Sequence, residues 1–156
     1  MAAIFAAREG VETLLLERTH DGGRKILISG GGRCNILPME VDESRFVTDS
    51  SHNTLRKIVR SWPLAEQRAF FEHELGIPLV DEADALKIFP ASHRARDVRD
   101  GLLAHARAKG VQIRMDSQVV GVAPTATGWR VELANAPSLD ANAVIVATGG
   151  LSVPNT

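Results

Sequence analysis

The sequence has little of several features that would point to a particular environment or partner. Its single cysteine, Cys34, excludes an internal disulfide. The 18 lysine and arginine residues nearly balance the 19 aspartate and glutamate residues, so the chain as a whole does not attract nucleic acid or an anionic membrane. No apolar segment approaches the ~20 residues that span a bilayer, and residues 1–7 lack the basic region of a secretory signal. We therefore expect a cytoplasmic protein with a small-molecule substrate, and neither nucleic acid nor membrane as a partner.

The motifs of several common catalytic sites are missing as well. The histidines show no metal-ligand spacing, and no second cysteine could complete a zinc site. There is no Walker A sequence and no serine elbow of the Gly-x-Ser-x-Gly kind. We therefore expect no metal site. The histidines concerned are His20, His52, His73, His93 and His105.

The most unusual stretch is residues 23–35, which read Gly-Arg-Lys-Ile-Leu-Ile-Ser-Gly-Gly-Gly-Arg-Cys-Asn. Three consecutive glycines remove every Cβ from a short path, so backbone N–H groups can approach a ligand closely or adopt positive φ without steric cost. The cations Arg24, Lys25 and Arg33 flank this bare backbone. The composition suits neither a helix nor a strand, and it predicts a loop that holds an anionic ligand, which we interpret as a phosphate-bearing cofactor.

The first 17 residues resemble the second half of a dinucleotide-binding βαβ unit. Residues 1–9 predict a helix ended by Gly10, and residues 11–17 predict a strand covered on both faces that ends at Glu17. In such a unit an acid about 20 residues after the glycine fingerprint binds the ribose. Counting back from Glu17 places the fingerprint before Met1, so we expect this chain to lack the first strand and the fingerprint. Spacing alone leaves open whether Glu17 binds ribose or is a solvated strand end.

The middle of the chain predicts helices joined by polar connections. Residues 38–53 predict a surface loop, followed by helices at 54–60 and 63–75 that begin at Asn53 and Ser61. An acidic turn at 81–84 and a short strand at 86–89 precede a helix at 93–109. The buried face of that last helix would consist of Ala95, Val98, Leu102 and Ala106, and its solvated face of Arg94, Arg96, Asp97, Arg99, Asp100 and Arg107.

The remaining segments predict strands. Residues 111–115 and 128–133 alternate between apolar and polar positions, and residues 118–122 follow directly after the first of these stretches. All three predict strands with one covered face. Residues 141–150 contain an apolar run, residues 143–147, that is followed by Thr-Gly-Gly, which is typical of a buried parallel strand. The carboxyl end of such a strand lines the ligand crevice of an open α/β sheet.

Three motifs together closely resemble the bacterial NAD(P)/FAD-dependent oxidoreductases of the BaiN/RdsA type. They are residues 23–35, residues 89–98 (Phe-Pro-Ala-Ser-His-Arg-Ala-Arg-Asp-Val) and residues 147–154 (Ala-Thr-Gly-Gly-Leu-Ser-Val-Pro). The resemblance implies an α/β fold, namely a Rossmann-like FAD-binding domain with a parallel sheet and an antiparallel β-meander that includes residues 111–133. The whole chain, 1–156, would then be part of one such domain, with segments at 1–37, 38–110 and 111–150.

The resemblance also implies roles for individual residues. Glu17 would hold the adenosine ribose, and Val120 would meet the adenine through its backbone. Residues 24, 25 and 30–35 would run along the pyrophosphate towards the flavin, and residues 147–149 would pass close to the cofactor. NAD(P)H would be the electron donor. The complete set of expected cofactor contacts is Glu17, Arg24, Lys25, Gly30, Gly31, Gly32, Arg33, Cys34, Asn35, Val120, Ala147, Thr148 and Gly149.

Two questions stay open at the level of sequence. The chain is either the FAD-binding portion of a flavin oxidoreductase or a truncated remnant that keeps the scaffold without tight flavin binding. Because the fingerprint is missing, we expect the 156-residue chain alone to bind FAD weakly or not at all. Ile36-Leu37-Pro38 replaces the Thr-Asn pair of many relatives, which suggests a subfamily with other side-chain contacts just past Asn35. Cys34 is either a redox or nucleophilic thiol, activated by Arg33 and nearby N–H groups, or a small apolar filler under a tight loop.

Overall fold

The structure is a computed structural model that describes residues 1–8 and 10–149. Its internal contacts divide the chain into two compact units. One unit contains residues 1–22 together with the residues from 106 onward, and the other contains Gly23–His105. Among the described residues, none of the helices combines the length and apolar character needed to cross a membrane.

The first unit begins with the predicted helix and strand. Helix α1 (Ala2–Arg8) is followed by Gly10 at φ 71°, and strand β1 (Leu14–Leu16) pairs in parallel with β5 (Gln112–Arg114). This order of helix, glycine and parallel strand confirms the sequence prediction. The strand is shorter than predicted, however, and Leu14 is 38% exposed, so β1 is not covered on both faces.

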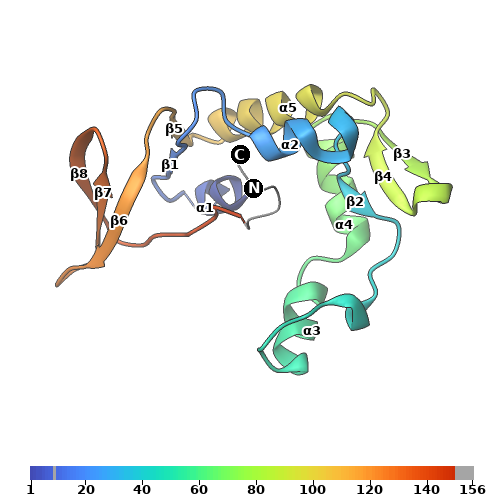
Figure 1. Cartoon of the computed structure of the whole chain (residues 1–156), viewed down its shortest axis with the longest axis horizontal. Coiled ribbons are helices and arrows are strands. Elements are labelled where there is room, and N and C mark those ends of the chain that lie inside the picture. Colours follow the sequence, from blue (N-terminus) through green and yellow to red (C-terminus); the bar gives the residue numbers. More distant parts are fainter. Residues whose placement is uncertain (9, 150–156) are drawn as a thin grey trace. The chain divides into compact units, whose positions relative to one another are not determined.

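An antiparallel meander completes the first unit (Figure 1). Strands β6 (Val119–Pro124), β7 (Trp129–Leu133) and β8 (Ala136–Ala141) follow one another in space as in sequence. The prediction of an antiparallel meander is therefore correct, but the strands assigned to it are partly wrong. Residues 112–114 do not belong to the meander, because they pair in parallel with β1. Its third strand is β8, which has no clean apolar alternation but lies beside β7 because a tight turn joins the two.

Residues 142–149 are the largest departure from the sequence prediction. They form no strand, and Ile145 and Val146 are 64% and 76% exposed. A buried parallel strand requires neighbours that accept its hydrogen bonds and cover its faces, and no strand among the described residues pairs with this segment. The rest of that predicted strand and of the 147–154 motif, residues 150–154, lies outside the described residues.

The second unit contains a three-stranded antiparallel sheet in the order β2-β4-β3. Strands β3 (Leu79–Glu82) and β4 (Lys87–Pro90) form a hairpin around the turn η4 (Ala83–Ala85), and β2 (Leu37–Pro38) flanks β4. The hairpin replaces the first half of the predicted acidic turn, because Asp81 and Glu82 pair with β4. The central strand carries Ile88 and Phe89, which are 3% and 2% exposed, so it forms the core of this unit.

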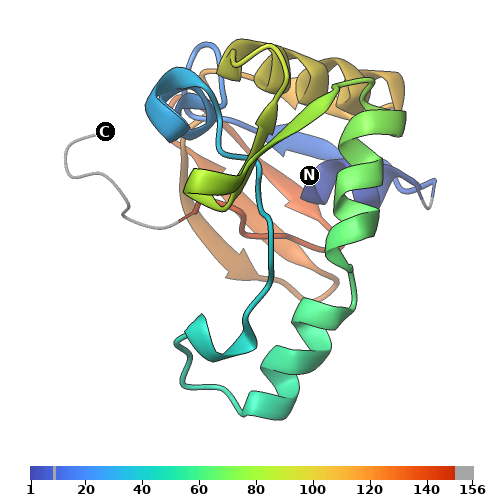
Figure 2. The same cartoon turned by 90° about the vertical axis from the view of Figure 1, so that its right-hand side faces the viewer.

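Two α-helices lie between β2 and β3 in sequence. The chain passes from β2 through the short turn η2 (Glu43–Arg45) to α3 (His52–Arg60), away from the β3–β4 hairpin (Figure 2). Helix α3 begins after Ser51, whose Oγ accepts from Thr54 N at 3.2 Å, and not at Asn53 as predicted. Helix α4 (Leu64–Ala69) follows Pro63 and continues into a π-helical turn, η3 (Phe70–Glu74). The predicted start at Ser61 is therefore wrong, because Ser61 ends α3 instead.

Helix α5 (Ala95–Ala108) confirms its predicted boundaries within two residues. Ala95, Val98 and Ala106 are 2%, 2% and 4% exposed, as expected for the apolar face. Arg99 is different, since it is only 8% exposed although its charge suggested a place on the solvated face. It lies four residues after Ala95, which puts both on one side of the helix.

Candidate functional site

The stretch of residues 23–35 starts with a helix where a loop was expected. Residues Arg24–Ile28 form α2, which follows Gly23 at φ 68°. The prediction underrated this segment, because Lys25 and Leu27 are good helix formers and only the glycines on either side break the helix. Arg24 and Lys25 are exposed at its start.

The three glycines form a turn with left-handed backbone. The turn η1 (Ser29–Gly32) has φ values of 56°, 67° and 86° at Gly30, Gly31 and Gly32. Only glycine adopts this conformation repeatedly at low cost. The turn therefore requires the three glycines, as the sequence predicted.

The glycines differ in what they face. A Cβ on Gly30 would lie 2.9 Å from Phe89 Cε1 and 3.0 Å from Asn35 N, so Gly30 packs against the hairpin and the loop itself. A Cβ on Gly31 would meet nothing within 4 Å, and one on Gly32 only Leu27 O at 3.9 Å. Gly31 and Gly32 thus present bare backbone with open space in front of it.

The end of the loop is fastened from within. Ser29 accepts through its carbonyl from Cys34 N at 3.0 Å and through Oγ from Asn35 N at 3.2 Å. Ile36 N then donates to Ile88 O at 3.0 Å, which joins the loop to β4. These bonds hold Cys34 at φ 65° with 5% exposure.

The environment of Cys34 bears on its two interpretations. Burial raises the pKa of the Cys34 thiol above its usual 9.0, which disfavours the thiolate that a redox or nucleophilic role requires. A small buried side chain under a left-handed turn fits the filler interpretation better.

Arg33 is fixed by three partners. Its Nη1 donates to Glu82 Oε1 at 2.6 Å, and its Nε donates to Gly30 O at 3.4 Å. Its guanidinium carbon lies 4.2 Å from the centre of the Phe89 ring. The side chain remains 42% exposed, so a ligand can still reach it.

Arg99 was missed by the sequence reasoning. Arg99 lies against the start of α2, since a Cβ on Gly23 would lie 2.6 Å from Arg99 Cγ. The guanidinium also contacts the neighbouring Asp100. Arg99 lies four residues after Ala95, which indicated that it shares the buried face of α5, but we assigned it to the solvated face because it is charged. Glu82 was missed for another reason, since its contact with Arg33 spans 49 positions of sequence.

The remaining predicted contacts belong to the first unit. Glu17 Oε1 accepts from Thr19 N at 2.8 Å and from Thr19 Oγ1 at 2.7 Å, which orients the carboxylate at the end of β1. Val120 is 58% exposed and lies where the register between β6 and β7 shifts, so its backbone is outside the regular ladder. Ala147 and Thr148 are exposed, and Gly149 has φ 71°.

The structure thus brings together residues 24–35 in one unit, with Glu82, Phe89 and Arg99 added to them. Glu17, Val120 and residues 147–149 lie in the other unit. Within residues 1–8 and 10–149, no three His, Cys, Asp or Glu side chains gather in a way that could hold a metal ion.

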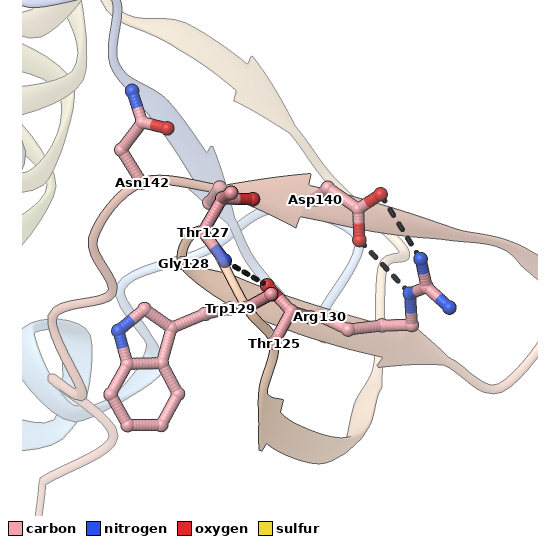
Figure 3. Close-up of a pocket in the computed structure, with 9 residues that line it drawn as sticks. Thr125, Thr127, Gly128, Trp129, Arg130, Asp140 and Asn142 are labelled. Atoms are coloured by element: carbon pink, nitrogen blue, oxygen red, sulfur yellow. Dashed lines mark hydrogen bonds and ion pairs between the residues drawn. The ribbon is translucent and has the colours of Figure 1, made fainter.

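A separate hollow of about 290 Å³ lies at the end of the meander, lined by residues 125–130 and 140–142 (Figure 3). Its charged groups bind each other, since Arg130 donates to both oxygens of Asp140 at 2.9 Å and 3.2 Å. The bonds from Arg130 hold the pKa of Asp140 below its usual 3.8. The hollow contains none of the predicted cofactor contacts.

Comparison with known families matches residues 1–156 to the HI0933-like protein Rossmann domain. The chain is 29% identical, over 96% of its length and 36% of the relative, to ribosomal RNA dihydrouridine synthase of Escherichia coli. The protein of that name from Haemophilus influenzae is 28% identical over 98% of the chain and 39% of its own length. The 3-dehydro-bile acid delta(4,6)-reductase of Clostridium scindens is 28% identical over 96% and 36%.

The chain therefore spans between 36% and 39% of the length of these relatives. Among solved structures, it is similar to the halogenase PltM, with a TM-score of 0.45 and 15% identity over 95% of the chain and 32% of that protein.

Proposed function

The chain belongs to the HI0933-like Rossmann domain family, and we propose that it is the FAD-binding portion of an NAD(P)/FAD-dependent oxidoreductase. The observation that carries this proposal is the turn at residues 29–32. It combines left-handed glycines, open space in front of Gly31 and Gly32, and an arginine fixed at its edge.

The residues present suit a dinucleotide. Arg24 and Lys25 lie exposed before the turn, and bare backbone lets a bulky anionic ligand approach N–H groups. In the other unit, Glu17 has a carboxylate oriented by Thr19, and an oriented carboxylate is what binds ribose hydroxyls in this type of domain. When bound, the flavin would supply the hydride chemistry, while these residues bind and orient it.

The names of the relatives suggest the type of reaction. Dihydrouridine carries two hydrogens more than uridine, and the third relative is named as a reductase. We propose that the whole protein reduces an unsaturated substrate with NAD(P)H as donor and that it acts in the cytoplasm.

Two substrate classes follow from those names, a small molecule and an RNA. The balanced charge of this chain, 18 cations against 19 anions, favours the small molecule. A gel-shift assay with ribosomal RNA would distinguish the two, because an RNA substrate predicts a complex that weakens with salt.

A titration of the purified chain with FAD, followed by flavin fluorescence and absorbance, tests the cofactor assignment. We expect weak but saturable binding that weakens further when Arg24 and Lys25 are both replaced by alanine. The matched control is the pair Arg56 and Lys57 on α3, the same two residue types in the same order, whose replacement should leave the affinity unchanged. Equal effects of the two double variants, or the absence of saturable binding, would favour the scaffold without a flavin site.

A further inference from the structure

The second sequence motif, residues 89–98, has no role in the cofactor contacts described so far. In the structure its first residue, Phe89, lies under two parts of the glycine turn. The ring edge faces Gly30, where a Cβ would come within 2.9 Å, and the ring face lies 4.2 Å from the guanidinium carbon of Arg33. Phe89 itself is 2% exposed. A ring buried this deeply is a rigid support for whatever rests on it.

Glu82 holds Arg33 from another side. The 2.6 Å bond from Arg33 Nη1 is charge-assisted, and Glu82 is 27% exposed, so water screens the pair only in part. His93, which has a left-handed φ of 50°, lies 3.6 Å from the same carboxylate oxygen through Nδ1. Glu82 therefore connects the turn to the hairpin and lies close to the start of the 89–98 motif.

These contacts fix the direction of the Arg33 guanidinium, but the Glu82 carboxylate offsets much of its positive charge. Of its five N–H donors, Nε and one N–H of Nη1 are engaged with Gly30 and Glu82. The carboxylate of Glu82 neutralises the guanidinium locally. An arginine that served only as a point charge for phosphate would bind better without such a partner.

We propose that Glu82 and Phe89 are positioning residues that aim the remaining N–H donors of Arg33 at a polar group of the bound cofactor. The inference rests on the proposed function, because it needs a cofactor at the glycine turn. It gives the 89–98 motif a role in the site, since Phe89 supplies the flat support while Glu82 sets the angle of the guanidinium. Arg33 then acts through directed hydrogen bonds, whose orientation is already set before the ligand arrives.

The replacement Glu82→Ala tests this through the sign of its effect on FAD affinity. Removing a carboxylate makes the site more positive, which by electrostatics alone would tighten the binding of anionic FAD. If orientation dominates, the freed Arg33 must be ordered on binding, and we expect the Kd to rise about 3- to 10-fold. The matched control is Asp81→Ala, one residue earlier on β3, which also removes a carboxylate bonded to an arginine at 2.6 Å, Arg68 Nη1. It should leave the Kd unchanged or lower it slightly.

A second measurement needs no flavin. In the chain without FAD, NMR hydrogen exchange at Arg33 Nε–H should become faster in Glu82→Ala and stay unchanged in Asp81→Ala. Unchanged exchange in Glu82→Ala would overturn the inference while the proposed function stands. So would a Kd for FAD that stays unchanged or falls in Glu82→Ala, as is expected for Asp81→Ala. A chain without substitutions that binds no FAD would instead overturn the proposed function and the inference with it.

Discussion

Replacing Gly30 by alanine should destabilise the second unit much more than the same replacement at Gly31. Both residues have left-handed backbone, with φ 56° and 67°, so an L-residue at either position costs about 1 kcal/mol in backbone strain. At Gly30 the new Cβ would also lie 2.9 Å from Phe89 Cε1 and 3.0 Å from Asn35 N. Phe89 is 2% exposed and cannot move aside, and overpacking of this kind costs about 1–3 kcal/mol more.

At Gly31 the Cβ would meet nothing within 4 Å. We therefore expect a loss of unfolding free energy of about 1 kcal/mol for Gly31→Ala and about 2–4 kcal/mol for Gly30→Ala.

Urea unfolding followed by tryptophan fluorescence measures this difference. Trp62 lies in the unit that contains the turn and packs edge-on against Phe70 at 5.8 Å between ring centres, whereas Trp129 belongs to the meander. A Trp129→Phe background leaves Trp62 as the reporter. Equal losses for the two alanine variants would refute the idea that Gly30 is needed for close packing against Phe89.

Two further predictions concern pH. Burial raises the pKa of the Cys34 thiol above its usual 9.0, so as pH rises this thiol ionises in the unfolded chain before it ionises in the folded chain. The unfolding free energy should therefore fall above about pH 9. Cys34→Ala should abolish that fall, and a fall that persists in this variant would point to another group. Hydrogen bonds from Arg60 and, to a smaller extent, Arg56 hold the pKa of Glu43 below its usual 4.5, so their contribution to stability is present above pH 4.5 and is lost as pH falls through the lowered pKa. The protection of the α3 amides, measured as the exchange rate relative to the intrinsic rate at each pH, should therefore fall on acidification, and Glu43→Gln should remove that pH dependence.

The sequence predicted the fold where local signals and pairing partners agreed. The helix, glycine and parallel strand at the start, the helix α5 and the existence of a meander are confirmed, and the family match confirms the Rossmann-like α/β class. The strand β8 was not predicted, and residues 142–149 do not form the buried parallel strand that was predicted for them. A strand exists only beside a partner, and which segments become neighbours is not encoded in apolar alternation alone.

For the candidate site, residues 24–35 could be identified from composition because glycine repeats and flanking cations are visible in one short stretch. The residues that contact this stretch, Glu82 and Arg99, could not be identified in this way. Glu82 looked like part of an acidic turn, and Arg99 looked like a solvated cation, because nothing local indicates a contact across 49 positions or the burial of one charge on a helix.

By itself, the sequence determined that residues 30–32 would adopt a conformation reserved for glycine, since the absence of Cβ is a local property of these three adjacent residues. It also determined which cations flank the turn. Only the tertiary structure decided that Gly30 faces inward while Gly31 and Gly32 face open space, and that Arg33 rests on Phe89 beside Glu82. The reason is that the packing of β4 against the turn distinguishes three residues that are chemically identical in the chain.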